Sequence, residues 1–157
     1  MVKQGEKVMS DFEQKITRLL RAEEGEVLHA YDDHLGYTTI GVGRLIDKRK
    51  GGGITAEESA FLLKNDIQKR ITALEAKLPW IKTLDDARRG VLLSMAFQMG
   101  VEGLLGFKNT LRLIQAGKYA EAATGMMNSK WAKQTPSRAQ RHAEQMRTGK
   151  WVIKAGF

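Results

Sequence analysis

The sequence predicts an α+β fold that is mostly helical, in which a long helix joins a small β-hairpin region to a helical bundle. Amphipathic helical periodicity dominates both ends of the chain, whereas residues 24–43 are rich in glycine and β-branched residues. A long apolar stripe between these regions ends at Pro79, which cannot continue a helix interior. With 157 residues, the chain is long enough for one domain or for two small lobes that share a core.

The first helix is expected over residues 11–23. Ser10 and Glu13 form a capping box at its start, and Gly25 is a natural stop. Its apolar residues share one face: Phe12, Ile16, Leu19 and Leu20. Glu24 therefore lies in the last turn, where the helix macrodipole disfavours an exposed negative charge by roughly 0.3–1 kcal/mol. A broken local rule is typical of a functional site, although solvated carboxylates at a frayed helix end give the same pattern.

A β-hairpin is expected next. Residues 27–31 are a candidate strand, residues 32–36 a turn and residues 37–43 a second strand. Gly41 and Gly43 alternate with apolar residues, so one face of the second strand is bare backbone. Glycine inside a strand is usually destabilising unless a ligand or another backbone approaches closely. We therefore expect this face to line a groove.

A basic, glycine-rich connector, residues 48–53, leads into the long helix. Thr55 and Glu58 form a second capping box at the start of this helix. Its apolar residues form a single stripe: Leu63, Ile67, Ile71, Leu74 and Leu78. At roughly 1.5 Å per residue the helix spans about 35 Å, the width of a small domain, so we expect it to bridge two lobes.

The rest of the chain is predicted to be helical. Thr83 is expected to cap a helix that is apolar on almost every side over residues 91–99 and stops at Gly100, which is typical of a buried core helix. Shorter helices bounded by glycine or proline are expected at about residues 108–115, 119–127 and 137–147. Trp131 and Trp151 are interpreted as structural, because tryptophan in a small helical domain usually belongs to the core.

Composition excludes several classes of protein. The chain has no cysteine, so disulfides and cysteine-ligated metals are excluded. Three histidines are present and show no paired metal-ligand spacing, namely His29, His34 and His142. We therefore expect no metal and no cofactor. No apolar run approaches the roughly 20 residues of a membrane helix, and the N-terminus lacks the apolar region of a signal peptide.

The positive charge is concentrated near the C-terminus. The net charge is +8, and residues 128–157 carry seven Lys and Arg against the single acidic residue Glu144, a net of +6. Such a segment suits nucleic acid, anionic lipid or the anionic bacterial envelope, and it also suits a solvated basic helix with no partner. Charge alone does not decide among these.

Four blocks of sequence stand in an order and spacing that indicate one family. They are Glu24-Gly25 with Tyr31-x-Asp33-x-x-Gly36-Tyr37-x-Thr39-Ile40-Gly41-x-Gly43, then Phe97-Gln98-Met99-Gly100, Gly106-Phe107-x-Asn109, and Trp131-x-x-Gln134-Thr135-Pro136-x-Arg138. Together they resemble the phage-type lysozymes, or muramidases, of the T-even coliphages. The likeness runs from about Leu19 to about Trp151, nearly the whole chain.

The resemblance implies a lysozyme-like two-lobed fold within a single domain, residues 1–157. The small β lobe would comprise residues 25–55 and the linking helix residues 56–79. The helical lobe would combine residues 1–24 with residues 80–157.

The resemblance also implies catalytic roles. Glu24 is the expected general acid, Asp33 the ionised base and Thr39 the hydroxyl that holds a water. An acid, a base and a positioned water describe an inverting glycoside hydrolase, whose two carboxyl groups stand roughly 6.5–9.5 Å apart. Asp32 competes with Asp33, since turn aspartates commonly cap their own backbone, but the family motif aligns Asp33.

Further residues are implied by the same resemblance. Arg138 is expected opposite Glu24, where a charge-assisted pair would orient the acid. Arg44 stands where the family has a histidine that pairs with an aspartate of the long helix, and Asp66 aligns with that aspartate. We expect Arg44 and Asp66 to form a salt bridge between the lobes. Substrate contacts are expected from Leu45, Phe97, Gln98 and Thr110. Gly125 stands where the family has a sugar-contacting asparagine, so one hydrogen bond to substrate is expected to be missing.

The implied function is hydrolysis of the β-1,4 bond between N-acetylmuramic acid and N-acetylglucosamine in peptidoglycan by a phage or prophage endolysin. The protein is expected to be a monomer in the host cytoplasm that binds no specific nucleic acid. It would reach the wall through a holin-type membrane partner and approach the anionic envelope through its basic C-terminal face. The rivals are a lytic transglycosylase, a basic nucleic-acid-binding protein and an inactive wall-binding module. The presence of Asp33 and Thr39 argues against the first and the last.

Overall fold

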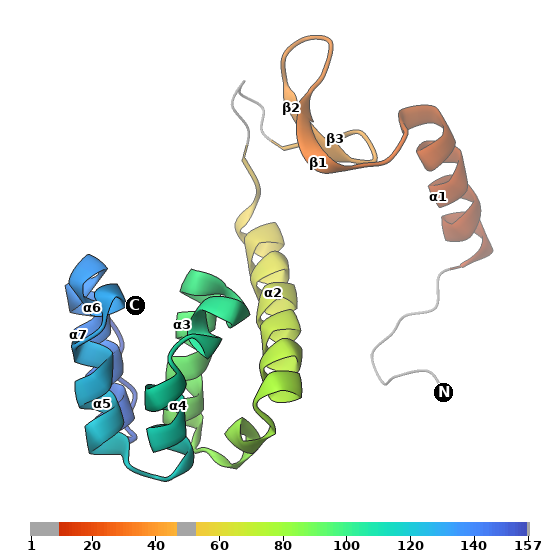
Figure 1. Cartoon of the computed structure of the whole chain (residues 1–157). Helices are drawn as coiled ribbons and strands as arrows, with labels where there is room; N and C mark the ends of the chain where they lie inside the picture. The colour runs from red at the N-terminus through yellow and green to blue at the C-terminus, as the bar shows by residue number, and fades with distance from the viewer. Residues whose placement is uncertain (1–9, 47–52, 157) are drawn as a thin grey trace. The chain divides into compact units, whose positions relative to one another are not determined.

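The computed structural model describes residues 10–46 and 53–156. The chain divides into two compact units, Met1–Ala60 and Phe61–Phe157, which we call the N-terminal unit and the C-terminal unit (Figure 1). Residues 1–8 and most of the basic connector, residues 48–52, lie outside the described part. The predicted grouping of residues 1–24 with the helical lobe concerns both units and stays a prediction.

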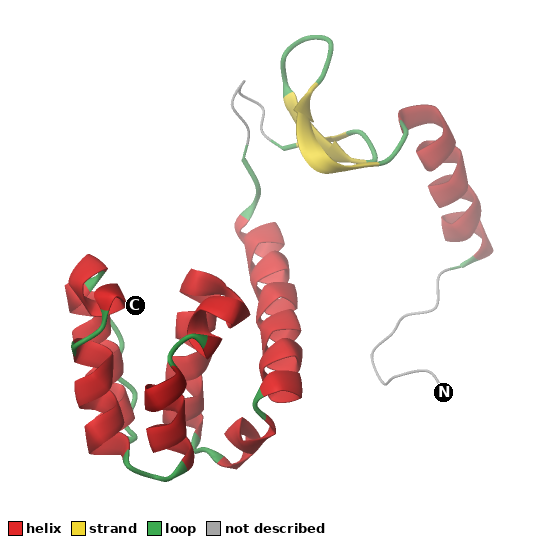
Figure 2. Ribbon diagram, viewed as in Figure 1, coloured by secondary structure: helices red, strands yellow, loops and turns green. Residues whose placement is uncertain are grey.

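The N-terminal unit contains one helix and a small antiparallel sheet (Figure 2). Its elements are α1 (Asp11–Glu24), β1 (Val27–Asp32), β2 (Thr38–Gly41) and β3 (Arg44–Leu45). The strand order is β1-β2-β3, and Thr39 lies opposite Tyr31 on one side and Leu45 on the other. This register places the centre of β2 between its two neighbours, so side chains from all three strands meet around Thr39.

The predicted capping box of α1 is confirmed. The backbone N–H of Ser10 donates to Glu13 Oε2 at 2.7 Å, and the N–H of Glu13 donates to Ser10 Oγ at 3.1 Å. The amphipathic pattern is also present, but no residue of α1 is buried, and Phe12 is 73% exposed. Within this unit α1 is therefore held by hydrogen bonds, caps and exposed ion pairs such as Arg21–Glu26, and not by buried apolar contacts.

The prediction of the second hairpin strand is wrong in one respect. Residues 37–43 are not one strand, because β2 ends at Gly41 and the chain turns through Val42 and Gly43 into β3. Gly41 has φ +67° and Gly43 has φ +61°, a backbone conformation that residues with a Cβ rarely adopt. The glycines are needed for a tight turn, and the alternation with Ile40 and Val42 in the sequence does not reflect a bare strand face.

The C-terminal unit is helical. Its elements are α2 (Ala56–Lys77), which begins in the N-terminal unit, a 3-10 helix (Pro79–Thr83), α3 (Asp86–Leu105), α4 (Lys108–Gln115), α5 (Tyr119–Met127), α6 (Lys130–Gln134) and α7 (Pro136–Thr148). The second capping box is confirmed, since the N–H of Thr55 donates to Glu58 Oε2 at 2.9 Å and the N–H of Glu58 donates to Thr55 Oγ1 at 3.2 Å. α7 packs against α3, α5 and α6 (Figure 1).

α3 is the central core helix, as its apolar composition predicts. Its buried residues include Val91, Leu92, Met95, Ala96 and Leu104. Gly100 breaks the helix as expected, with φ +80°, but a further turn continues to Leu105. The predicted cap Thr83 is wrong, because Asp85 is the N-cap and accepts from the N–H of Arg88 at 3.0 Å.

The two tryptophans interpreted as structural differ. Trp131 is buried, and its indole N–H donates to Gln98 Oε1 at 2.9 Å. Trp151 is 59% exposed, so its prediction as a core residue is wrong. One edge of its ring nevertheless lies against Gly90 of α3, where a Cβ would stand only 2.6 Å from the ring. In the described part of the chain no single helix is long and apolar enough to cross a membrane, although α3 and α4, bent by 102°, pass that test as a pair.

Candidate active site

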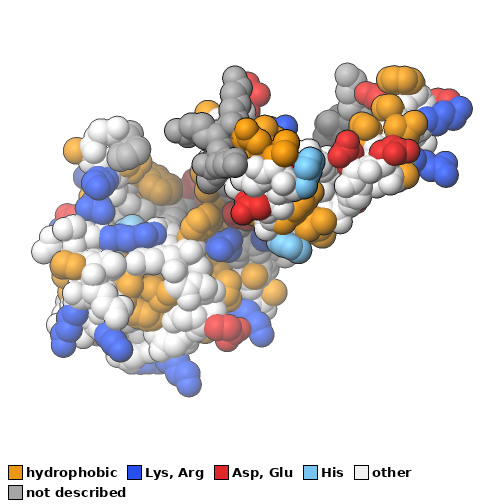
Figure 3. Space-filling model, turned by 90° about the horizontal axis from the view of Figure 1, so that it is seen from above, with side chains coloured by type: hydrophobic (Ala, Val, Ile, Leu, Met, Phe, Trp, Pro, Cys, Tyr) orange, Lys and Arg blue, Asp and Glu red, His pale blue; other side chains and the backbone are white. Residues whose placement is uncertain are grey.

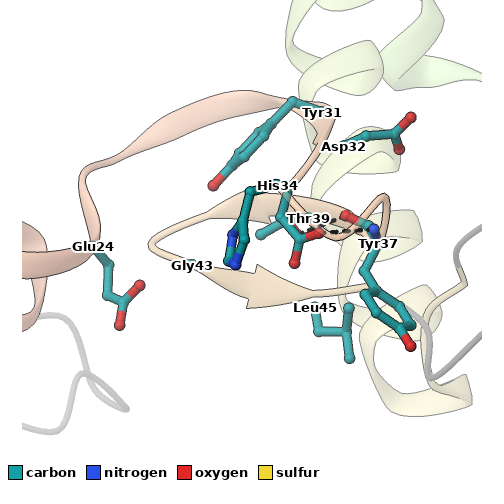
Figure 4. A pocket seen from close by; sticks show the side chains of 9 residues that line it. Glu24, Tyr31, Asp32, His34, Tyr37, Thr39, Gly43 and Leu45 are labelled. Carbon is teal, nitrogen blue, oxygen red and sulfur yellow. Dashed lines mark hydrogen bonds between the residues drawn. The ribbon is translucent and has the colours of Figure 1, made fainter. Parts of the chain in front are cut away.

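The N-terminal unit carries a cavity of about 720 Å³ (Figure 4). The residues that line it are Glu24, Tyr31, Asp32, Asp33, His34, Tyr37, Thr39, Gly43 and Leu45. All three predicted catalytic residues are therefore on the wall of one cavity, together with the predicted substrate contact Leu45. The volume lies within the roughly 300–1,000 Å³ of typical ligand sites.

Glu24 is placed by the end of α1. It is the last residue of the helix, and Gly25 follows with φ +71°, its N–H donating to Arg21 O at 3.0 Å. The Glu24 side chain lies over the turn between β2 and β3, because a Cβ on Gly43 would stand 2.6 Å from Glu24 Oε2. The carboxylate is exposed within the N-terminal unit, whereas partial exclusion from water would favour the protonated form that a general acid needs.

Asp33 is held by the turn that follows β1. Its Oδ1 accepts the backbone N–H of Leu35 at 2.9 Å and that of Tyr37 at 2.8 Å. The N–H of Tyr37 is the largest influence on the pKa of the Asp33 carboxyl and lowers it below its ordinary 3.8. Desolvation, the second influence, opposes this shift, and the N–H of Leu35 adds a smaller lowering. Asp33 is therefore ionised at neutral pH.

The two turn aspartates, Asp32 and Asp33, do not divide the capping role and the role of the base between them as we expected. Asp33, the residue that we predicted as the base, is also the one that caps its own turn. Asp32 instead accepts the hydroxyl of Thr38 at 3.3 Å. The capping hydrogen bonds of Asp33 fix the orientation of its carboxylate in the cavity wall, so the structural role and the chemical role reside in one side chain.

Thr39 is the most enclosed residue of the site, with 5% of its surface exposed. Its hydroxyl donates to the carbonyl oxygen of Tyr37 at 3.0 Å. Because the proton of the hydroxyl is used in this bond, the oxygen lone pairs remain available as acceptors. The side chain can therefore accept a hydrogen bond from a water in the cavity, as the prediction requires.

Sequence reasoning missed part of the cavity wall. Tyr31, His34 and Tyr37 line it beside the catalytic candidates (Figure 4). Tyr31 pairs with Thr39 across β1 and β2, and paired residues on adjacent strands present side chains to the same face. The available sequence signal was the place of Tyr31 and Tyr37 in the family motif. Within the described residues, no group of three or more His, Cys, Asp and Glu side chains is arranged to hold a metal ion.

The other predicted substrate contacts belong to the C-terminal unit. Phe97 is 37% exposed, and the Arg70 guanidinium lies 4.3 Å from its ring centroid, a cation–π geometry. Gln98 is exposed, and its Oε1 accepts the indole N–H of Trp131. Thr110 is buried beside Gly125, so the structure does not present its hydroxyl to a ligand as we expected.

The two predicted ion pairs join residues of different units. Within the N-terminal unit, Arg44 forms a salt bridge with Glu58 in the first turn of α2. Its predicted pairing with Asp66 would join the two units and stays a prediction. The backbone carbonyl of Asp66 accepts from Arg70 Nη1 at 3.4 Å. The predicted pairing of Arg138 with Glu24 would also join the two units and stays a prediction.

Comparison with known proteins gives a consistent result. A family model described as phage lysozyme matches residues 21–146. The probable T4-type lysozyme 1 of Dictyostelium discoideum is 35% identical over 85% of this chain and 94% of its own length. The endolysin of Salmonella phage P22 is 38% identical over 77% of this chain and 84% of its own length. The pre-baseplate central spike protein Gp5 of Enterobacteria phage T4 is 32% identical over 80% of this chain, but over only 26% of Gp5.

Proposed function

This chain belongs to the phage lysozyme family, and from that premise we propose that the cavity of the N-terminal unit is the catalytic site of a peptidoglycan-cleaving glycoside hydrolase. The observation that carries the proposal is the presence of Glu24, Asp33 and Thr39 on the wall of one cavity. The proposed reaction is hydrolysis of the β-1,4 bond between N-acetylmuramic acid and N-acetylglucosamine.

Glu24 is the proposed general acid, which protonates the leaving glycosidic oxygen. Its position is supported by the turn between β2 and β3, since only a glycine at position 43 leaves room for the carboxyl group. A saccharide bound in the cavity would cover this exposed side chain, and covering a carboxyl group favours its protonated form.

Asp33 and Thr39 are the proposed holders of the attacking water. A water that donates one hydrogen bond to the ionised Asp33 and another to Thr39 Oγ1 keeps a lone pair directed at the anomeric carbon. As the new C–O bond forms, Asp33 takes the first proton, while Glu24 gives its proton to the departing sugar. The hydrogen bonds of Asp33 to Leu35 and Tyr37, and of Thr39 to Tyr37, support this arrangement because they fix both acceptors before substrate binds.

The proposed stereochemistry is inversion. Direct attack of water from the face opposite the leaving group gives the inverted anomer, and it needs the roughly 6.5–9.5 Å between carboxyl groups that leaves room for a water. A retaining reaction would instead need a carboxylate close enough to form a glycosyl-enzyme bond. Thr39 supports inversion, because a residue that holds a water has no role in forming the glycosyl-enzyme bond of a retaining reaction.

The proposed biological role is lysis of a bacterial host as a phage or prophage endolysin. The relative from phage P22 bears that name. Residues 61–157 carry 17 Lys and Arg against 7 Asp and Glu, a net charge of +10, and basic side chains outnumber acidic ones on the face of this unit in Figure 3. Such a unit would be attracted to the anionic envelope. Synthesis in the host cytoplasm and passage to the wall through a holin-type membrane partner complete the proposal.

The test is digestion of purified peptidoglycan in heavy-oxygen water. The wild type and the control variant Glu23→Gln, which changes an exposed neighbouring carboxylate, should release reducing, isotope-labelled muropeptides. Their first-formed anomer should be inverted when followed by NMR. Glu24→Gln and Asp33→Asn should release almost none. Anhydro products, or full activity in Asp33→Asn, would replace the proposal with a lytic transglycosylase.

A further inference from the structure

One side chain on the wall of the cavity has no part in the reaction proposed above. His34 lies in the turn that follows β1 and lines the cavity beside Asp33 (Figure 4). It occupies a position between Asp33 and Gly36 that the family motif leaves open, so the resemblance gives it no role. His34 is exposed within the N-terminal unit, and a ligand in the cavity can therefore contact its imidazole.

The turn that carries His34 is held by hydrogen bonds on both sides of it. Asp33 Oδ1 accepts the N–H of Leu35 at 2.9 Å and that of Tyr37 at 2.8 Å. The backbone adds two more bonds, since the N–H of Asp33 donates to Tyr37 O and the N–H of Gly36 donates to Asp33 O, both at 2.9 Å. The backbone of His34 is thus fixed before a ligand binds, which lowers the entropic cost of a contact with its side chain.

The charged groups that surround His34 in the cavity are carboxylates. They are Glu24 at the end of α1, Asp32 at the end of β1 and Asp33 of the turn. The rest of the described wall consists of phenol, hydroxyl, backbone and aliphatic groups, from Tyr31 of β1, Tyr37, Thr39 of β2, Gly43 and Leu45 of β3. Among the described residues that line the cavity, His34 is therefore the only one whose side chain can carry a positive charge.

The substrate of the proposed reaction is itself anionic. Peptidoglycan carries carboxylates on the lactyl groups of its N-acetylmuramic acid or on the peptides joined to them. A wall with three carboxylates disfavours such a ligand, because like charges that approach one another lower affinity. A cationic imidazole on the same wall makes the interaction attractive at one point.

We propose that His34 is a specificity-determining residue that, in its charged form, contacts a carboxylate of the peptidoglycan strand bound in the cavity. The inference rests on the proposed function, because it takes the saccharide bound there to be peptidoglycan. Asp33 does not need His34 in order to stay ionised, since the N–H of Tyr37 is the largest influence that lowers the pKa of its carboxyl, and the charge of His34 has a smaller effect. Loss of the imidazole charge should therefore change KM and leave kcat nearly constant.

The test compares two substrates that differ only in charge. One is soluble peptidoglycan fragments, and the other is the same fragments after carbodiimide coupling of their carboxylates to methylamine. At about pH 5.5, where an imidazole is ordinarily charged, His34→Gln should raise KM on the native fragments about two- to fivefold, the range for one exposed ion pair. His34→Lys, which keeps a positive charge, should stay near the KM of the wild type. All three proteins should share one KM on the amidated fragments.

The matched control is His29→Gln, the same substitution at an exposed position of β1 that is not among the residues lining the cavity. It should leave KM unchanged on both substrates. An equal rise of KM for His34→Gln on native and amidated fragments would show that the charge of the substrate is irrelevant and would overturn the inference. A His34→Lys variant as impaired as His34→Gln would overturn it as well.

A binding measurement separates this inference from the proposed function. In a Glu24→Gln background, the dissociation constant for native fragments should rise about two- to fivefold on His34→Gln, and that for amidated fragments should not change. Equal dissociation constants with and without His34 on the native fragments would overturn the role of His34. If the wild type failed to cleave peptidoglycan, the proposed function would fail, while this comparison would still decide whether His34 binds a carboxylate.

Discussion

The acid sensitivity of the C-terminal unit should depend on His142. Burial, followed by the charges of Arg138 and Arg141, lowers the pKa of His142 from its ordinary 6.5 to about 4 in the folded chain. Between these two values the unfolded chain binds a proton that the folded chain does not bind. Stability therefore falls as pH decreases from about 6.5 to about 4, and His142→Gln, which cannot titrate, should remove that part of the fall.

The size of the effect follows from the shift. Between pH 7 and pH 4.5, a group whose pKa moves from 6.5 to about 4 on folding contributes an upper bound of about 2.4 kcal/mol. His142 keeps some contact with solvent, and screening reduces this figure, so we expect a difference of about 1–1.5 kcal/mol between wild type and variant. The lowered pKa of Asp33 lies outside this window, because its stabilising effect is lost only as pH falls below about 3.8.

The assay is urea unfolding followed by tryptophan fluorescence at several pH values. All three tryptophans, Trp80, Trp131 and Trp151, belong to the C-terminal unit, so the signal reports the unit that contains His142. The free energy of unfolding of the wild type should fall more steeply with decreasing pH than that of His142→Gln. Parallel curves for the two proteins between pH 7 and pH 4.5 would refute the lowered pKa of His142.

Three further predictions concern catalysis and binding. Gly43→Ala and Gly41→Ala should each lower the free energy of unfolding by urea by about 1–2 kcal/mol, because both glycines have positive φ. Only Gly43→Ala should also lower kcat more than tenfold, since its Cβ meets Glu24 whereas a Cβ at Gly41 meets nothing within 4 Å. Equal kcat values for the two variants would contradict this. Asp33→Asn should lower kcat about a hundredfold or more with substrate binding retained in a pull-down assay, and activity that persists would remove Asp33 as the base. Replacing Lys130, Lys133 and Lys150 together by glutamine should weaken binding to cell walls at low salt but not at high salt, as a co-sedimentation series would show.

The sequence predicts the local features of this structure well. Both capping boxes are confirmed, because a serine or threonine followed three residues later by glutamate satisfies backbone groups that every helix start exposes. The bounds of α4 and α5 agree with prediction, since Gly106 and Gly117 flank α4 and Gly117 also precedes α5. Thr83 was wrong as a cap because Asp85 can perform the same role two residues later. α6 was missed because its five residues are too few to show a helical period.

For the candidate site, the sequence predicts which residues take part, but it does not predict the contacts between distant segments of the chain. The family resemblance identified Glu24, Asp33 and Thr39, and the structure places them around one cavity. The contact of Glu24 with the glycine turn has no sequence signal, because it depends on how α1 ends and on where β3 begins. The same holds for His142 and Ser94, which are 48 positions apart and meet only when α7 packs on α3.

The chemistry of the N-terminal unit is built on very little core. Among its described residues, Thr39 alone is buried, and α1 buries none. A small sheet with so little buried surface has low stability by itself, and Asp33 and Thr39 contribute hydrogen bonds that hold its turn. The groups proposed to hold the water are thus also groups that hold the turn. Substitution of Asp33 should therefore lower both the catalytic rate and the protection of the turn amides from hydrogen exchange, whereas Glu24→Gln, which leaves every turn bond intact, should affect only the rate.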